Sequence, residues 1–86
     1  MHKVEYLESV IKDDISKLPK IEKKKIKKAI EERLTQDSVH FGKPLRYSLK
    51  GCRRMRVGNY RVIFKLETRI VLIVKIGHQK EIYTIK

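Results

Sequence analysis

A β-hairpin at residues 52–66 is the feature of this sequence that most restricts the fold. Apolar residues alternate there mainly with arginine or lysine, and these apolar residues are Met55, Val57, Tyr60, Val62, Phe64 and Leu66. Gly58-Asn59, between the two runs, supplies the positive backbone dihedrals of a two-residue turn. Because successive side chains of a strand point to opposite faces, the hairpin must have one apolar face and one basic face.

A third strand is predicted directly after the hairpin, over residues 69–76. Its alternate positions are apolar, namely Ile70, Leu72, Val74 and Ile76. The connection at Glu67-Thr68 is too short for a crossover, so this strand must be antiparallel to the strand before it. A short strand is also predicted at residues 2–6.

Two helices are predicted before the hairpin. The first has a stripe of apolar residues at helical spacing, with Ser9 as a candidate cap and Pro19 as its end. This stripe consists of Leu7, Ile11, Ile15 and Leu18. The second helix covers residues 20–36 and has a dense lysine face opposite a second stripe. That stripe consists of Ile21, Ile26, Ala29, Ile30 and Leu34.

These elements predict an α+β fold in one domain, residues 1–86, with two N-terminal helices packed on one face of a small antiparallel sheet. Eighty-six residues are enough for a single small core. The helices would cover the face that carries Met55, Val57, Val62, Phe64, Leu72 and Val74. The opposite, open face would then carry four cations, Arg54, Arg56, Arg61 and Lys75.

The charge of the chain indicates a polyanionic partner. The net charge is +12 at pH 7, and positions 38–66 contain eight Lys or Arg but no Asp or Glu. Such a balance favours nucleic acid, an anionic membrane surface or an acidic protein. Further candidate RNA contacts are Lys43, Arg46, Lys50, Arg53, Lys75 and Lys80. With one cysteine, no signal-peptide pattern and no membrane-spanning apolar run, we expect a cytoplasmic protein with no membrane partner.

The basic half of the chain offers phosphate-binding and titratable groups but no metal site. Only Glu67 and Glu81 are acidic after position 50, and no Cys/His spacing for zinc occurs, so we expect no cofactor. RNA can be cleaved without metal, because its 2′-hydroxyl is an internal nucleophile and arginine stabilises charge on the phosphate. His78 and Tyr83 are candidates for proton transfer. On composition and periodicity alone, the sequence indicates only a basic nucleic-acid-binding domain, in which His78 caps a strand end and Tyr83 packs.

Three parts of the sequence carry a family resemblance: Arg54-Met55-Arg56-Val57-Gly58-Asn59-Tyr60-Arg61-Val62-Ile63-Phe64, then Ile76-Gly77-His78, and then Tyr83. With them the chain resembles the RelE/ParE superfamily of bacterial toxins, in particular its RelE-type branch. The resemblance implies a microbial ribonuclease-like fold and the toxin of a type II toxin–antitoxin system. It also implies an enzyme, an mRNA interferase that enters the ribosomal A site, cleaves messenger RNA without metal and inhibits translation. The partners it implies are the ribosome, its mRNA and a cognate acidic antitoxin.

By position, Arg54 and Arg56 match the two basic residues of the family before the turn. Arg61 matches its transition-state arginine and Tyr83 its C-terminal tyrosine, so that Tyr83 or His78 would be the general base. Many members have arginine after Gly-His, where this chain has Gln79-Lys80, so the second phosphate-clamping cation is either Lys80 or missing. Two alternatives stay open: a ParE-like inhibitor that acts by binding DNA gyrase, and an RNA- or ribosome-binding protein that does not cleave.

Overall fold

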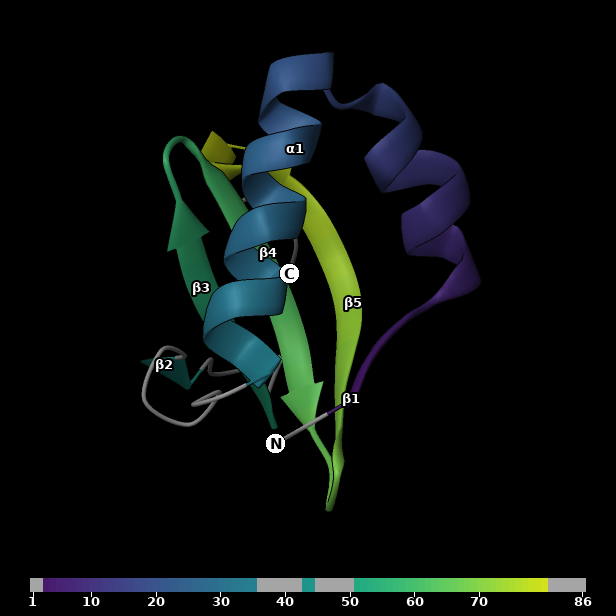
Figure 1. Cartoon of the computed structure of the whole chain (residues 1–86), viewed down its shortest axis with the longest axis vertical. Helices are drawn as coiled ribbons and strands as arrows, with labels where there is room; N and C mark the ends of the chain where they lie inside the picture. The colour runs from purple at the N-terminus through teal and green to yellow at the C-terminus, as the bar shows by residue number, and fades with distance from the viewer. Residues whose placement is uncertain (1–2, 36–42, 45–50, 81–86) are drawn as a thin grey trace.

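Five strands form one mixed sheet with β4 at its centre (Figure 1). The computed structural model describes residues 3–35, 43–44 and 51–80. Its strands are β1 (Lys3–Tyr6), β2 (Lys43–Pro44), β3 (Cys52–Val57), β4 (Tyr60–Leu66) and β5 (Ile70–His78). They are ordered β1-β5-β4-β3-β2, and β1 is parallel to β5 while all other neighbours are antiparallel. The predicted antiparallel pairing of β3, β4 and β5 is confirmed, and so is the short strand predicted at residues 2–6, which is parallel to β5 at one edge.

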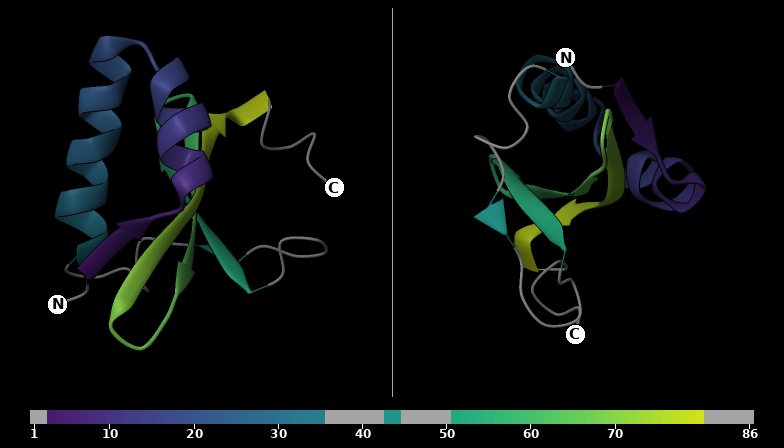
Figure 2. Two further views of the ribbon diagram at one scale, coloured as in Figure 1. Left: turned by 90° about the vertical axis from the view of Figure 1, so that its right-hand side faces the viewer. Right: turned by 90° about the horizontal axis from the view of Figure 1, so that it is seen from below.

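The helical segments lie together on one side of this sheet (Figure 2). They are η1 (Val10–Asp14), a π-helical turn, η2 (Ile15–Lys17), a 3₁₀ turn, α1 (Lys20–Ala29) and η3 (Ile30–Leu34), a second π-helical turn. The extended backbone of Pro19 separates η2 from α1, as its position in the sequence predicts. The α+β class, with two helical segments on one face of the sheet, is therefore confirmed. None of the described helices has the length and apolar character needed to cross a bilayer.

The hairpin has the predicted turn and register. Gly58 has a φ of 59°, and Val57 lies opposite Tyr60 at the two ends of the turn. The pairing continues along β3 and β4 to Cys52 and Lys65 without a register shift. Residues that lie opposite one another point to the same side of the sheet, so each cross-strand pair can be assigned to a face.

A register shift between β4 and β5 reverses the predicted faces of β5 before Val74, whereas Ile76 keeps its predicted place in the core. Ile63 lies opposite Lys75 but Phe64 lies opposite Ile73, so β5 contains one extra residue, Val74. The core residues of β5 are consequently Val71, Ile73 and Ile76. The prediction that Leu72 and Val74 face the helices is wrong, because a strict period of two cannot anticipate an inserted residue.

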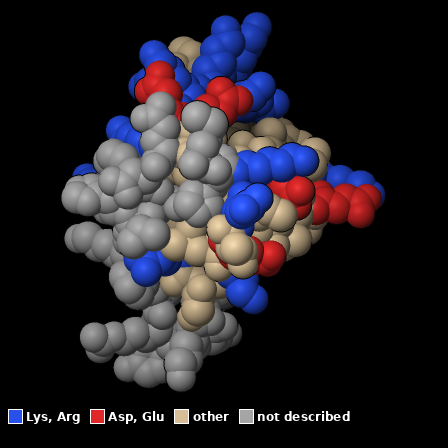
Figure 3. All heavy atoms as spheres, turned by 60° about the horizontal axis from the view of Figure 1, so that its bottom comes forward, with Lys and Arg blue, Asp and Glu red and all other residues tan. Residues whose placement is uncertain are grey.

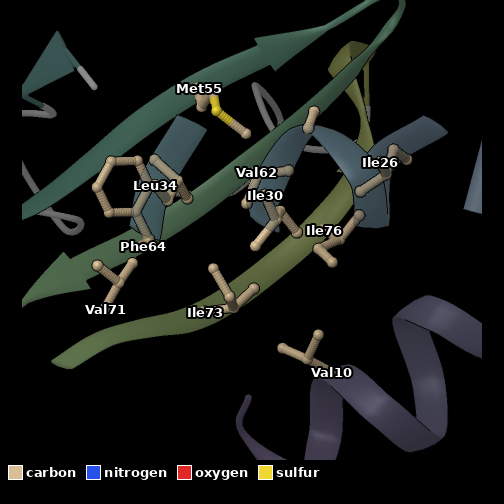
Figure 4. Packing of buried hydrophobic residues seen from close by; sticks show 11 residues of the cluster. Val10, Ile26, Ile30, Leu34, Met55, Val62, Phe64, Val71, Ile73 and Ile76 are labelled. Atoms are coloured by element: carbon tan, nitrogen blue, oxygen red, sulfur yellow. The ribbon is translucent and has the colours of Figure 1, made fainter. Parts of the chain in front are cut away.

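The core lies between the helical segments and the sheet, where apolar side chains from both layers meet (Figure 4). Residues of the second helical segment that were expected here are buried, namely Ile26, Ala29, Ile30 and Leu34. They pack with Val62 and Phe64 of β4, and each large side chain buried in this way contributes about 1.5–3 kcal/mol. Ile21 was also expected in the core but is 68% exposed.

The first helical segment follows the predicted stripe only in its second half, where Ile15 and Leu18 are partly buried against the core. Val10 is fully buried and Asp14 is only 8% exposed, whereas Leu7 and Ile11 are 38% and 54% exposed. Ser9 has helical backbone angles and makes no side-chain capping bond. The buried stripe therefore contains a carboxylate, that of Asp14, which binds the edge of β5.

Asp14 is buried because it binds the part of β5 that extends beyond β1. The pairing of β1 with β5 stops at Ile73. Beyond it, Asp14 Oδ2 accepts the backbone N–H of Ile76 and Oδ1 accepts the Lys75 ammonium, both at 2.9 Å. The carboxylate thus takes the place of a strand partner at Ile76 and fixes η1 against the sheet.

Candidate nucleic-acid interface

Three arginines lie on the side of the sheet that faces away from the helices, which we call the arginine face. Arg56 of β3 is directly opposite Arg61 of β4, and Arg54 is opposite Ile63 in the next pair on the same face. Met55 and Val62, the intervening pair, point into the core. Strand parity therefore brings Arg54, Arg56 and Arg61 together as the sequence predicts.

Arg61 is not exposed on this face, contrary to the expectation of an open surface. Its residue is only 6% exposed, and its NH1 group donates to the carbonyl oxygens of Gly58 at 3.1 Å and Tyr60 at 3.0 Å. Its NH2 group donates to Gln79 Oε1 at 2.6 Å. Ile63, in the adjacent pair, is fully buried. The guanidinium is therefore held in one place by the hairpin turn and by the end of β5.

The positive charge of the arginine face is not balanced by carboxylates on the strands. Strands β3, β4 and β5 contain no Asp or Glu, and no described residue pairs with the exposed guanidinium of Arg56. Like charges directly opposite one another destabilise a strand pair, so Arg56 and Arg61 together favour a bound anion. In the helical layer, by contrast, lysines lie close to carboxylates, and Figure 3 shows Asp and Glu among Lys and Arg on one face of the molecule. One example is Lys28, which is 4.0 Å from Glu32.

Lys75 does not join the three arginines, although it is in the same cross-strand row as Arg54 and Ile63. Its ammonium is bound to Asp14, and its side chain is 38% exposed. The predicted group of four converging cations is therefore reduced to three. The sequence does not reveal this ion pair, because 61 positions separate the two residues.

His78 belongs to the opposite, helix-facing side of the sheet. It is opposite Tyr60, and the two rings make an edge-to-face contact with centroids 5.6 Å apart. Its Nδ1 accepts the backbone N–H of Lys80 at 3.2 Å. His78 therefore does not lie beside Arg56 and Arg61, and its position gives no support to its predicted catalytic role.

The remaining predicted RNA contacts are distributed around this site. Lys80 is exposed just after β5, and Lys43 of β2 is opposite Arg54 in the backbone register. Arg53 is opposite Phe64, in a pair that faces the helices. Three predicted site residues, Arg46, Lys50 and Tyr83, lie outside the described residues.

A groove of about 740 Å³ lies on the helix-facing side, between the start of α1 and the hairpin turn. Its lining includes Lys20, Lys25, Tyr60 and His78. The groove is separated from the arginine face by the sheet. Among residues 3–35 and 51–80, no three His, Cys, Asp or Glu side chains are grouped as a metal site requires.

Two contacts at this site were missed by reasoning from the sequence. Gln79 was noted only as a departure from arginine, yet it accepts a hydrogen bond from Arg61. Asp14 was not part of the predicted apolar stripe, yet it is buried and binds β5. Asp14 lies four residues after Val10 and so on the same helix face, but the burial of Val10 is itself evident only from the structure.

A protein-family model described as the ParE toxin of the type II toxin–antitoxin system, parDE, matches residues 7–83 of this chain. The match includes every described element from η1 to β5. No curated protein matches the chain.

Solved toxin structures have the same fold. The toxin–antitoxin complex RelBE2 from Mycobacterium tuberculosis matches with a TM-score of 0.83 and 25% identity, over 91% of this chain and 98% of that one. The RelB–RelE complex from Methanococcus jannaschii matches with a TM-score of 0.71 and 26% identity, over 92% and 94%. The isolated E. coli RelE toxin has a TM-score of 0.73 at 18% identity, over 98% and 93%, which is a likeness of fold alone.

Proposed function

This chain belongs to the ParE toxin family of type II toxin–antitoxin systems, within the RelE/ParE superfamily, and we propose that it is a ribosome-dependent endoribonuclease that cleaves messenger RNA in the A site. The observation that carries the proposal is the cross-strand pair of Arg56 and Arg61 on a part of the sheet, strands β3, β4 and β5, that contains no carboxylate. Arg54 extends this face by one more cation. An RNA phosphate is the ligand that such a group of guanidinium donors fits.

The proposed reaction uses the 2′-hydroxyl of the RNA as the nucleophile. Its oxygen attacks the adjacent phosphorus, the bond to the 5′-oxygen of the next nucleotide breaks, and a 2′,3′-cyclic phosphate remains. Negative charge increases on the phosphate oxygens during this step, and a fixed donor such as Arg61 stabilises it without reorganisation. The 2′-hydroxyl proton goes to a general base, and the leaving oxygen is protonated.

For the proton transfers we propose Tyr83 first and His78 second. Arginine is an unsuitable general base, because its pKa lies far above neutral pH. His78 points to the helix-facing side and contacts Tyr60, which favours Tyr83 for the arginine face. Ribosomal RNA supplies further groups in this scheme.

We also propose a cognate acidic antitoxin as the partner that neutralises the protein. RelBE2 and the RelB–RelE complex from Methanococcus jannaschii are both toxin–antitoxin complexes. With a net charge of +12, this chain is electrostatically complementary to an acidic protein.

The second candidate function is inhibition of DNA gyrase by protein binding. One observation favours it, namely that the matching family model is that of the ParE toxin. Inhibition by binding needs no RNA chemistry, so this candidate leaves Arg56 and Arg61 without a catalytic role.

The first prediction separates these candidates through the products. Incubation with programmed ribosomes is expected to cut messenger RNA in the A site, with primer extension as the readout, and to leave 2′,3′-cyclic phosphate ends by mass spectrometry. In single-turnover assays Tyr83→Phe is expected to cut slowly while still binding ribosomes, and His78→Ala is expected to lose less. A 3′-hydroxyl product would contradict this chemistry. Intact messenger RNA together with inhibited gyrase supercoiling would favour the second candidate.

The second prediction concerns salt. Each cation that neutralises a phosphate releases counterions, so replacing Arg56 with alanine is expected to reduce the slope of log K against log salt by about 0.7–0.9. Binding to ribosomes or single-stranded RNA between about 50 and 200 mM salt gives this slope. Lys12→Ala is the control, because it removes the same charge from a lysine paired with Glu8 at 2.7 Å in the first helical segment. An equal change in both variants, or affinity that does not depend on salt, would argue against phosphate binding at Arg56.

A further inference from the structure

We propose that Gln79 is a positioning residue that orients the Arg61 guanidinium toward the RNA phosphate; this inference rests on the proposed endoribonuclease function. Gln79 Oε1 accepts a hydrogen bond from Arg61 NH2 at 2.6 Å, the shortest of the three bonds made by this guanidinium. An arginine at position 79 would place a second cation next to Arg61. A neutral acceptor fixes the guanidinium, whereas a second cation would repel it.

The backbone holds Gln79 at the same turn that holds Arg61. The N–H of Gln79 donates to the carbonyl of Asn59 at 2.9 Å, and Gly77 is opposite Arg61 in the β4–β5 pairing. Gly58 and Tyr60, on either side of Asn59, provide the two carbonyls that bind NH1. Both residues of the Arg61–Gln79 contact are therefore attached to one hairpin turn, which holds their backbones close together.

These contacts use only part of the hydrogen-bonding capacity of the guanidinium. A guanidinium has five N–H donors. Three bonds from NH1 and NH2 go to Gly58, Tyr60 and Gln79. Within the described part of the chain, the Nε–H and one N–H of NH2 are left for a phosphate oxygen. Without Gln79, NH2 would have to be oriented by the substrate itself, and the donors would no longer be preorganised.

A kinetic double-mutant cycle tests this role. Gln79→Met keeps the length of the side chain and removes the acceptor. We expect it to lower the single-turnover cleavage rate on programmed ribosomes by about 10- to 100-fold, the range for losing one hydrogen bond to a charged group. We expect ribosome affinity to change much less. In an Arg61→Ala background the same substitution is expected to have no further effect, because its action passes through Arg61. Thr68→Ala, at the exposed β4–β5 turn, is the control and should keep the wild-type rate.

Thermal unfolding of the four proteins of the cycle, together with Gln79→Glu, separates failure of this inference from failure of the proposed function, because it needs no substrate. If the contact is real, the losses in Tm from Gln79→Met and Arg61→Ala are less than additive, and Gln79→Glu, which keeps an acceptor, retains the wild-type Tm. Additive Tm losses, or a wild-type cleavage rate in Gln79→Met, would overturn the positioning role. A third result is possible, in which the Tm losses are less than additive but the wild-type protein does not cleave messenger RNA. That result would overturn the proposed endoribonuclease function and, with it, the catalytic role of the Arg61–Gln79 contact.

Discussion

Replacing Arg61 with alanine is expected to lower messenger RNA cleavage by about 100- to 1000-fold, the loss that follows removal of one preorganised donor from a developing charge. The guanidinium is fixed by bonds to Gly58, Tyr60 and Gln79 before any substrate binds. Single-turnover rates on programmed ribosomes measure this effect.

The same substitution is also expected to reduce stability, because Arg61 is 6% exposed and not on an open surface. Its removal leaves partly buried carbonyls without their donor, which costs about 1–3 kcal/mol for each group that water cannot reach. Rates should therefore be measured well below the Tm of the variant, with circular dichroism as the check on folding. Lys65→Ala is the control, since it removes a charge from an exposed position of the same strand. A folded Arg61→Ala protein with a near-normal rate would exclude the catalytic role.

Replacing Asp14 with alanine is expected to destabilise the fold more than any other change of an acidic residue among those described. The Ile76 N–H loses its acceptor, which costs about 1–3 kcal/mol, and Lys75 loses its partner. The contribution from Lys75 is smaller, because its side chain is 38% exposed and water can replace the carboxylate. In a domain of this size each kcal/mol lowers Tm by about 4–8 °C.

Asp13→Ala is the matched control for Asp14, because it removes the same charge from the adjacent, exposed position. It should leave Tm nearly unchanged. Asp14→Asn keeps one oxygen that can accept from Ile76, so an intermediate Tm is expected. Equal Tm values for Asp13→Ala and Asp14→Ala would show that the carboxylate at the edge of β5 does not hold the first helical segment in place.

The hairpin and the arginine face could be predicted from the sequence because both depend on local rules. Gly58-Asn59 fixes the turn, and a period of two then fixes which residues of β3 and β4 share a face. Arg54, Arg56 and Arg61 follow from this pattern alone. The buried stripe of α1 and η3 follows in the same way from a period of 3.6, with Ile21 as its one error.

The other features depend on contacts between distant parts of the chain, which periodicity does not encode. Val74 interrupts the alternation of β5 through a register shift that only pairing with β4 reveals. Asp14 is buried because a strand edge needs an acceptor, and no local rule indicates that need. Gln79 and Arg61 are 18 positions apart, so a residue that looked like a lost cation is in fact a hydrogen-bond acceptor.

The contact between Asp14 and β5 also protects the edge of the sheet from pairing with a strand of another copy of the protein. A long bare strand edge is a template on which another chain can add a strand, the first step of edge-to-edge aggregation. Here the outermost strands are short, four residues in β1 and two in β2. Where β5 extends beyond β1, the N–H of Ile76 is already occupied by the Asp14 carboxylate. A residue that fastens a helix to the sheet thus also keeps an incoming strand from pairing at that point.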